Sequence, residues 1–561
     1  MKNQIVNLLS QNIEVLTSEE ISQLIEIPPK PEMGDFAFPC FRLAKSYHKA
    51  PPMIAQDLKE SIGDQAFLSE IKVVGGYLNF YVDKAQYAQQ IIDKYNNATD
   101  YGCSDQGKDK TICIDYSSPN VAKNFHVGHL RTTIIGNSLY KIFSKLGYKV
   151  VRINHLGDWG TQFGKLIVAY KKWGSREAVE EKGIEELMDI YVKFHEEAEK
   201  DDSLNDEARA WFLKMEQGNE EALEIWQWFR DISLKEFMRV YNILGMEFDS
   251  FAGESFYRDK TADVIKCLTD DGLLKESQGA MIVPLDEYDM PPCIVAKKDG
   301  SSIYATRDLA AILYRKATYN FDRCLYVTGL EQKLHFAQVF KVIELMGNDY
   351  AKNLVHIPYG LVSLKSGKIS SRKGNVIFAE DLLRESINKT TSIIEDKNPD
   401  IPDKEEVAKQ VGIGAIIFND LYNQRIKDVI FDWNKLLNFD GETGPYVQYT
   451  YARASSVLRK IGEVPDTIDY TLLTDEASIG LLKEIERYPQ VIKDAAERYE
   501  PSVIARYSID LAHAFNKFYH ECQINVEDET TKYTRTNVVK IARYIIKDAL
   551  SLLGIQCPEQ M

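Results

Sequence analysis

Residues 111–153 open with a short apolar run, TICIDY (111–116), and close with a second one, KVVRI (149–153). Between the two runs, apolar residues recur at helical spacing as far as Leu146, and Gly147 stands where a helix end favours glycine. A strand, a helix and a strand in this order are typical of a β-α-β unit, whose two strands run parallel in one sheet. The stretch therefore predicts a parallel, Rossmann-like sheet.

The same pattern returns far along the chain, with strands predicted at 324–328 and 354–357 and a helix at 332–346. The intervening residues 170–290 have helical patterns. They hold 30 acidic residues and 15 Lys and Arg, a balance of −15, and therefore account for nearly all of the net charge of −16 of the chain. The sheet is thus predicted to be split by an acidic, largely helical insertion. Because the rest of the chain is nearly neutral, the overall acidity does not exclude a nucleic-acid partner.

The 561 residues are too many for one core and predict about three or four domains. Alternation at 71–82, broken by a glycine pair, predicts a hairpin in a small N-terminal α/β domain. Beyond about residue 381, amphipathic patterns predict helices at 407–422, 447–461, 479–496, 503–522 and 537–553. The predicted domains are an N-terminal α/β domain (1–108), a Rossmann-like α/β catalytic domain (109–380, insertion about 170–290), a helical connecting region (381–439) and an all-α C-terminal domain (440–561).

The eight cysteines include no C-x-x-C pair, so neither a disulfide framework nor a metal site is predicted. The first residues lack a signal-peptide core, and no stretch approaches the ~20 apolar residues that cross a bilayer. We expect a soluble, cytoplasmic protein.

The segment HVGH (126–129) lies between the first strand and its helix, at the carboxyl edge of the predicted sheet, where ligands bind. The usual phosphate loops, G-x-x-x-x-G-K-[ST] and G-x-G-x-x-G, are absent from the sequence. A helix start offers unpaired N–H groups to phosphate, Gly128 permits close approach, and His126 and His129 can donate to oxygens that gain charge. Taken alone, the segment also suits two histidines that only make structural hydrogen bonds.

Longer stretches carry a family resemblance. HVGH matches the HIGH motif of class I aminoacyl-tRNA synthetases and related nucleotidyltransferases, and residues 117–137 and 154–164 resemble arginyl-tRNA synthetases almost residue for residue. SGKISSRKGN (366–375) resembles the KMSKS loop, with Ser371 where the family has its second lysine; Lys123 is expected to substitute. The resemblance implies catalytic roles for His126, His129, Lys123 and Lys368, and ATP binding by Gly128, His126, His129, Gly157, Asp158, Lys368, Ser370 and Arg372.

An arginine pocket needs a carboxylate that accepts two parallel hydrogen bonds from the guanidinium. YATRDLAA (304–311) resembles the family's Y-x-T-x-D element, which implies that Tyr304 and Asp308 contact substrate arginine, and Gln332 resembles a further contact. Local sequence also allows Thr306 as a helix N-cap, with Asp308 in the first turn, where carboxylates are favoured anyway. The resemblance adds Asn120, Ser117 and Asp115 to the arginine contacts, although the family often has glutamate at the position of Asp115.

Residues 28–45 resemble the family's N-terminal domain, which touches the tRNA D-loop, and 440–453 resemble the start of its anticodon-binding domain. Tyr446 and Tyr449 could stack on tRNA bases, although tyrosines three apart on a helix are often core residues. The resemblance implies a monomeric arginine–tRNA ligase that uses ATP with Mg²⁺ as substrate, holds no tightly bound metal or organic cofactor, does not bind membranes, and needs tRNA even for arginine activation.

Two alternatives stay open from the sequence. One is a HIGH-motif nucleotidyltransferase that joins ATP to a small acid without RNA, which the helical C-terminal third argues against. The other is a catalytically silent, synthetase-like RNA-binding protein, which the intact motif residues argue against. Exchange of labelled pyrophosphate into ATP, with its dependence on arginine and tRNA, separates all three.

Overall fold

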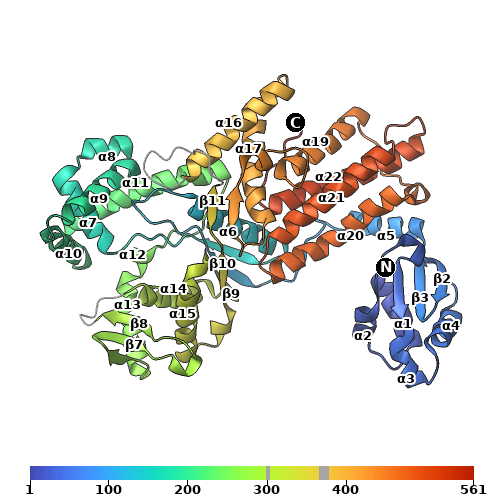
Figure 1. Ribbon diagram of the computed structural model, residues 1–561, viewed down its shortest axis with the longest axis horizontal. Helices are drawn as coiled ribbons and strands as arrows, with labels where there is room; N and C mark the ends of the chain where they lie inside the picture. The colour runs from blue at the N-terminus through green and yellow to red at the C-terminus, as the bar shows by residue number, and fades with distance from the viewer. Residues whose placement is uncertain (298–302, 365–377) are drawn as a thin grey trace. The chain divides into compact units, whose positions relative to one another are not determined.

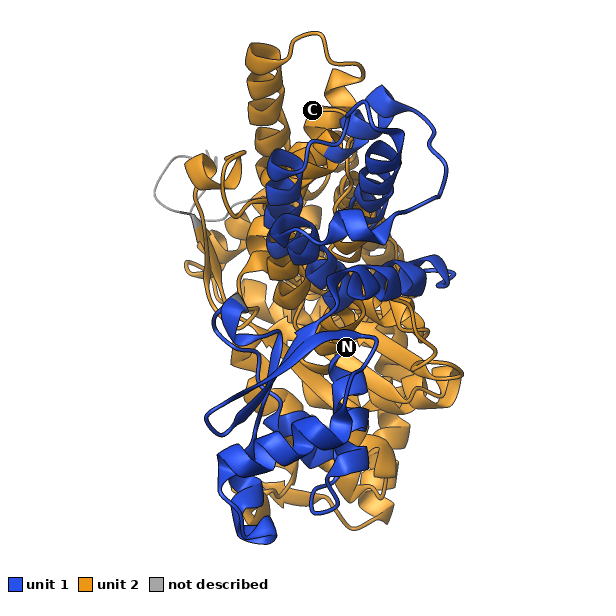
Figure 2. Cartoon of the chain, turned by 90° about the vertical axis from the view of Figure 1, so that its right-hand side faces the viewer, with its two compact units in different colours: residues 1–101, 454–488, 510–545 blue, residues 102–453, 489–509, 546–561 orange. Residues whose placement is uncertain are grey.

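The computed structural model describes residues 1–297, 303–364 and 378–561. The chain forms two compact units, each built from segments that are far apart in sequence (Figure 2). Unit 1 comprises residues 1–101, 454–488 and 510–545, and unit 2 comprises 102–453, 489–509 and 546–561. The four-part domain division expected from the sequence stays a prediction.

Unit 2 contains the predicted parallel sheet (Figure 1). Its strands are β4 (Thr111–Asp115), β5 (Lys149–Ile153), β9 (Arg323–Gly329) and β10 (Leu354–Tyr359), in the order β10-β9-β4-β5. Every neighbouring pair is parallel, and Cys113 of β4 lies beside Val151 on one side and Cys324 on the other. The Rossmann-like sheet, split by a long insertion between β5 and β9, is confirmed.

The chain reverses its direction of travel across this sheet between β4 and β9. From β4 it passes through α6 (Val127–Lys145) to β5, whereas from β9 it passes through α15 (Lys333–Leu345) to β10 on the opposite side. Helix α6 ends where the sequence predicts, because Gly147 takes a left-handed conformation with φ of 85° just after it. The carboxyl ends of β4 and β9 therefore flank a crevice of the kind in which α/β sheets bind ligands.

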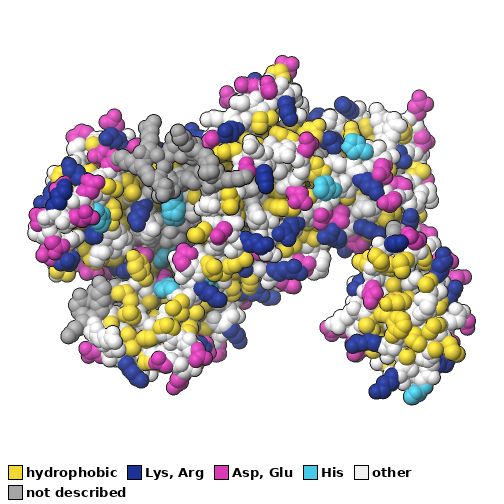
Figure 3. Space-filling model, in the orientation of Figure 1, with side chains coloured by type: hydrophobic (Ala, Val, Ile, Leu, Met, Phe, Trp, Pro, Cys, Tyr) yellow, Lys and Arg dark blue, Asp and Glu magenta, His cyan; other side chains and the backbone are white. Residues whose placement is uncertain are grey.

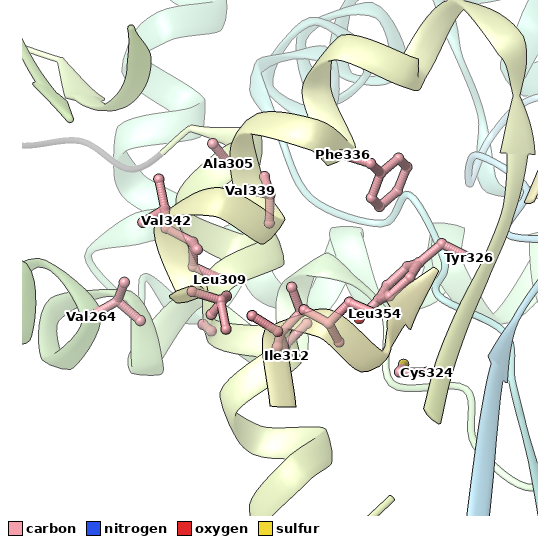
Figure 4. Close-up of a cluster of buried hydrophobic side chains, with 14 of the residues drawn as sticks. Val264, Ala305, Leu309, Ile312, Cys324, Tyr326, Phe336, Val339, Val342 and Leu354 are labelled. Atoms are coloured by element: carbon pink, nitrogen blue, oxygen red, sulfur yellow. The ribbon is translucent and has the colours of Figure 1, made fainter. Parts of the chain in front are cut away.

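The two faces of the sheet are covered by different helices. On one face, Cys324 and Tyr326 of β9 pack with Leu309 and Ile312 of α14 (Tyr304–Tyr319) and with Phe336 and Val339 of α15 (Figure 4). On the other side, α6 approaches Tyr116 so closely that a Cβ on Gly136 would lie 2.2 Å from the ring. Helix α6 is thereby held against the end of β4, and its first turn lies at the crevice.

The insertion folds mainly as helices around its own core, which includes Trp159, Phe163, Leu187, Trp211 and Phe229. A three-stranded antiparallel sheet in the order β6-β7-β8 follows. That sheet was not predicted, because strands of three to five residues carry little periodicity. The elements are α7 (Thr161–Trp173), α8 (Arg176–Lys182), α9 (Ile184–Ala198), α10 (Ser203–Glu216), α11 (Glu220–Leu244), α12 (Glu254–Tyr257), α13 (Thr261–Asp270), β6 (Lys275–Ser277), β7 (Ala280–Val283) and β8 (Cys293–Lys297).

Unit 1 begins with a small α/β arrangement whose sheet order is β1-β3-β2, with both pairs antiparallel. The predicted hairpin is present: Gly75 turns the chain between β2 and β3 with φ of 60°. Hydrophobic side chains gather on the surface of this part in Figure 3, and the exposed large ones include Ile27, Phe41, Met53 and Val74. The elements are α1 (Lys2–Asn12), α2 (Ser18–Leu24), β1 (Phe36–Pro39), α3 (Ala44–Tyr47), α4 (Pro51–Ile62), β2 (Leu68–Val74), β3 (Tyr77–Val82) and α5 (Lys84–Asn96).

The C-terminal part is helical, as predicted, apart from β12 (Val429–Phe431), which pairs in parallel with β11 (Val362–Leu364). Its helices are α16 (Ala379–Lys397), α17 (Lys404–Tyr422), α18 (Trp433–Leu436), α19 (Gly444–Ile461), α20 (Glu476–Glu497), α21 (Ser502–Glu521) and α22 (Glu529–Leu552). In the described part of the chain, no helix is both long and apolar enough to cross a membrane.

Candidate active site

A cavity of about 1030 Å³ opens at the crevice beside the carboxyl ends of β4 and β9. Its walls come from the first turn of α6, the start of α14, the start of α15 and the turn between β10 and β11. Segments far apart in sequence therefore meet around one space. The residues predicted for the site that line it are Asp115, Ser117, Asn120, His126, Gly128, His129, Gly157, Tyr304, Asp308 and Gln332.

Other predicted residues lie elsewhere. Lys123 is exposed beside the cavity, where its positive charge contributes to lowering the pKa of both imidazoles. Tyr446 is half-buried and Tyr449 is exposed on α19, with Arg453 4.9 Å from the Tyr449 ring centroid. Lys368, Ser370 and Arg372 lie outside the described residues.

Asp158 is not brought to the cavity. Its side chain is 0 % exposed, and its carboxylate accepts hydrogen bonds from the Ser255 amide and hydroxyl, each at 2.8 Å, and from Arg230 Nε at 3.0 Å. These contacts tie the turn after β5 to α11 and α12. The structure thus gives this carboxylate packing partners within the protein where ATP contact was expected.

The two histidines form the start of α6. The amide of Gly128 donates to His126 Nδ1 at 3.1 Å, and the amide of His126 donates to His129 Nδ1 at 3.3 Å. The rings stack, with centroids 3.8 Å apart and planes 20° apart. Because each Nδ1 accepts a backbone hydrogen bond, the network assigns the proton of each neutral ring to Nε2. Both imidazoles therefore make the structural hydrogen bonds expected at a helix start, and each keeps an Nε2–H that can donate to a ligand.

The protonation state of this pair follows from its surroundings. Burial, followed by the charges of His126 and Lys123, lowers the pKa of His129 to about 3. Burial and then Lys123 lower the pKa of His126 as well. Two stacked rings beside a lysine disfavour a further positive charge. At neutral pH both histidines are thus neutral donors rather than cations.

A carboxylate lies at the α14 side of the cavity. Asp308 Oδ2 accepts a hydrogen bond of 2.6 Å from His335 Nε2, and both residues line the cavity. Burial pushes the pKa of Asp308 upward, but the hydrogen bond from His335 and the charges of His335, His155 and Arg315 lower it below its ordinary value. Asp308 is therefore ionised and held in one orientation, as binding of a cation requires.

A second carboxylate was missed by the sequence reasoning. Glu254, at the start of α12, lines the same cavity, with Oε2 3.3 Å from Arg307 Nη2. Burial raises the pKa of Glu254 to about 8; Arg307 opposes this rise, while Asp308 and Asp158 add to it. Local sequence carries no signal for this residue, because it lies within a long acidic segment where glutamate is common.

The start of α14 differs from the prediction. The helix begins at Tyr304 with Ile303 as N-cap, so Thr306 lies inside the first turn and Asp308 lies in the second. Thr306 Oγ1 donates a hydrogen bond to the carbonyl of Val295 and accepts one of 3.4 Å from the amide of Ile303. Tyr304 is 61 % exposed, and Arg307 lies 5.0 Å from its ring centroid. Because Asp308 lies beyond the first turn, the preference of the helix dipole for acidic residues in that turn does not explain an aspartate at this position.

Asp115 and Ser117 line the cavity but already have protein partners. Asp115 Oδ2 lies 2.7 Å from Arg315 Nη2, and its Oδ1 accepts the Ser118 hydroxyl at 2.9 Å. Ser117 Oγ lies 2.7 Å from the hydroxyls of Tyr241 and Thr133. Both side chains are thus held by internal contacts. Among the described residues, no cluster of three or more His, Cys, Asp or Glu side chains could hold a metal ion.

The chain is similar to known proteins along its whole length. The chain matches the family model for the catalytic domain of class I (R) tRNA synthetases over residues 91–433, the arginyl tRNA synthetase N-terminal domain over 3–82 and the DALR anticodon binding domain over 447–561. It is 55% identical over 559 residues to the arginine–tRNA ligase of Clostridioides difficile (strain 630), covering 99% of both chains. It is 54% identical over 562 residues to that of Alkaliphilus metalliredigens (strain QYMF), covering 100% of this chain and 99% of the relative.

A solved structure shows the same fold. The arginyl-tRNA synthetase of Thermus thermophilus superposes with a TM-score of 0.82 at 24% identity, covering 100% of both chains. The match of the family model over most of the chain, together with identity above half along its full length, leads to one conclusion. The chain belongs to the family of arginyl-tRNA synthetases, within the class I aminoacyl-tRNA synthetases.

Proposed function

We propose that the cavity binds L-arginine and ATP together and joins them as arginyl-adenylate, the first step of charging. As a member of its family, the chain charges tRNA with arginine. One observation carries the assignment of this cavity: two carboxylates suited to a guanidinium and two neutral imidazole donors suited to phosphate line a single space at the edge of the sheet.

The guanidinium end is proposed at Asp308 and Glu254. A planar guanidinium can donate to both carboxylates, and Tyr304 and Gln332, which also line the cavity, are proposed as further contacts. Asn120, which pairs with Gly157 and lines the cavity, is proposed to bind the polar α-carbon end of arginine. The side chains of Asp115 and Ser117 are held by contacts within the protein, so we propose that they fix the shape and the electrostatic potential of the cavity beside arginine.

In the first step, a carboxylate oxygen of arginine attacks the α-phosphorus of ATP, and pyrophosphate leaves from the opposite side. We propose that His126 and His129 donate Nε2–H to phosphate oxygens as these gain charge, and that Lys123 supplies a nearby positive charge. Gly128 leaves room for the phosphates at the start of α6. On the family resemblance alone, Lys368 is proposed to share in balancing this charge, and Lys368, Ser370 and Arg372 are proposed to bind ATP. Mg²⁺ enters with ATP.

In the second step, a hydroxyl of the tRNA 3′-terminal adenosine attacks the adenylate carbonyl, which yields arginyl-tRNA and AMP. Tyr449, exposed on α19, and Tyr446 beside it are proposed to stack on tRNA bases. We further propose a monomer that acts in the cytoplasm, which fits eight cysteines that are all free thiols.

Exchange of labelled pyrophosphate into ATP tests the proposal. We expect exchange that requires arginine and is stimulated by cognate tRNA. Exchange without any response to RNA would favour a small-molecule nucleotidyltransferase, and no exchange under any condition would favour a silent RNA-binding relative. Asp308→Ala should then raise the arginine requirement without changing that for ATP; an unchanged KM for arginine would remove Asp308 from the pocket.

A further inference from the structure

Arg131 is the most completely buried charged residue of α6, and it is two residues beyond His129. Its side chain is 1 % exposed. Nη1 donates to the carbonyls of Gly360 and Leu361 at 2.8 and 2.9 Å, and Nη2 donates to those of Lys427 and Arg425 at 2.8 and 3.1 Å. One guanidinium thus joins three parts of the chain.

The first two carbonyls belong to the turn between β10 and β11. Residues 359–363 comprise this turn and the adjoining strand ends, and we call them the β10–β11 wall. All five line the cavity. The other two carbonyls lie on the segment between α17 and β12, and Asp420 of α17 places Oδ1 3.1 Å from Arg131 Nε. Arg131 therefore connects the wall to the same helix whose first turn presents His126 and His129.

A second arginine, Arg425, makes hydrogen bonds to the wall and to the residue before it. Arg425 donates Nη1 to the carbonyl of Pro358 at 2.8 Å and Nε to the carbonyl of Tyr499 at 3.0 Å. Its amide donates to Glu500 Oε1 at 3.2 Å. The carbonyl of Arg425 accepts both the Gly360 amide, at 3.0 Å, and Arg131 Nη2. The two arginines hold the wall as one hydrogen-bonded assembly.

Backbone amides along the wall have little freedom to shift. The amide of Leu361 donates to Asp428 Oδ1 at 2.7 Å, and a Cβ on Gly360 would lie 2.7 Å from Asp428 Oδ1 and from the carbonyl of Ile426. Only a planar fork with several donors can span four carbonyls on two segments, and the single nitrogen of lysine cannot. The position therefore requires arginine geometry rather than only a positive charge.

We propose that Arg131 is a positioning residue of the activation step, which holds the β10–β11 wall in register with His126 and His129. This inference rests on the proposed function of the cavity. Arg131 holds the wall against α6, and α6 begins with the two histidines proposed to bind phosphate. Displacement of the wall should therefore raise the KM for ATP or lower the rate of activation. The proposed arginine contacts are Asp308, Tyr304, Glu254, Gln332 and Asn120. The hydrogen bonds and the ion pair of Arg131 go to other residues, so the KM for arginine should stay the same.

The test compares Arg131→Lys with the matched control Arg323→Lys. Arg323 donates Nη1 to the Tyr499 hydroxyl at 3.2 Å and does not line the cavity. In pyrophosphate exchange, we expect Arg131→Lys to raise the KM for ATP or to lower kcat at least tenfold, with the KM for arginine within twofold of the wild type. Arg323→Lys should leave all three constants within twofold.

A second measurement does not depend on activity. Hydrogen exchange of the Gly360 and Leu361 amides should quicken at least tenfold in Arg131→Lys while the core amides of β4 keep their protection. Unchanged kinetic constants and wall protection in a folded Arg131→Lys protein would overturn the inference. Uniform loss of protection would also overturn it, because the residue would then act on overall stability.

If Arg131→Lys does not fold, pyrophosphate exchange and amide hydrogen exchange are measured on Arg425→Lys instead. The same changes are expected, and unchanged kinetic constants and wall protection would again overturn the inference. Failure of the proposed function looks different, since the wild type itself would then show no arginine-dependent exchange. In that case the amide protection of the wall decides whether Arg131 positions it.

Discussion

Asp115 Oδ2 lies 2.7 Å from Nη2 of Arg315, and this arginine, at 1 % exposure, is one of the most deeply buried charges in the protein. Arg315 Nη2 also lies 3.3 Å from His155 Nδ1. The carboxylate that family resemblance assigned to the substrate is therefore held by a guanidinium of the protein itself. A buried ion pair of this kind is costly to break by removing one partner.

This pair leads to the first prediction, which concerns stability. Asp115→Asn should lower the free energy of unfolding by about 3–5 kcal/mol, because Arg315 would remain buried without its counter-charge. Urea denaturation followed by circular dichroism measures the change. The double variant Asp115→Leu, Arg315→Met should lose less than Asp115→Asn alone. A loss below about 1 kcal/mol in Asp115→Asn would mean that water or His155 compensates Arg315.

The second prediction concerns pH. Since burial raises the pKa of Glu254 to about 8, this side chain is mostly protonated at neutral pH without ligand, and a bound guanidinium favours its ionised form. Arginine affinity should therefore rise with pH between 6 and 8, by up to about tenfold per unit, and binding at pH 7 should release close to one proton. Calorimetry in buffers of different ionisation enthalpy measures the release.

Glu254→Gln is the control for this titration, and it should bind arginine with little pH dependence in the same range. The pH dependence of folding stability has the opposite sign to that of arginine affinity. Because the folded pKa lies above the ordinary value of 4.5, the contribution of Glu254 to stability is full below pH 4.5 and is lost as the pH rises through about 8. An arginine affinity that stays flat from pH 6 to 8 in the wild type would contradict the assignment.

The third prediction separates Asp308 from the residue that orients it. Asp308→Asn should raise the KM for arginine about 100- to 1000-fold, because a charge-assisted guanidinium contact is lost, with the KM for ATP unchanged. His335→Asn should have a smaller effect in the same direction, because it removes the hydrogen bond that orients Asp308 and helps to lower its pKa but leaves the carboxylate in place. Steady-state pyrophosphate exchange measures both. A larger effect of His335→Asn than of Asp308→Asn would reverse their roles.

The fourth prediction follows from the proton positions of the histidine pair. His129→Ala should lower kcat about 100- to 1000-fold, as expected for loss of a donor to developing charge. His129→Gln, whose amide nitrogen can take the place of Nε2, should keep more activity than His129→Asn, whose amide is too short. Equal activity of the Gln and Asn variants would argue against Nε2 as the donor. Because the pKa of His129 is about 3, no activity change between pH 5 and 9 should trace to its protonation.

The order of strands and helices could be predicted from the sequence, because periodicity is a local property. The β4–α6–β5 unit, the return of the sheet after the insertion and the long C-terminal helices all follow from the spacing of apolar residues along the chain. The segment around His126 and His129 could be proposed as a phosphate site from its place between a strand and a helix, whereas Tyr304 and Asp308 follow only from the family resemblance. The structure brings all four residues to one cavity. The short strands β6, β7, β8 and β12 escaped prediction because so few residues carry no reliable period.

Only the tertiary structure decided which charges face which partners. Glu254, Arg131 and the Asp115–Arg315 pair join residues that are between 53 and 296 positions apart in the chain. It also decided that Asp158 is enclosed by Ser255 and Arg230 rather than open to the cavity. The pKa of a buried carboxyl or imidazole depends on the dielectric and the charges within a few ångströms. Those neighbours are set by how distant segments pack, which no local pattern of residues encodes.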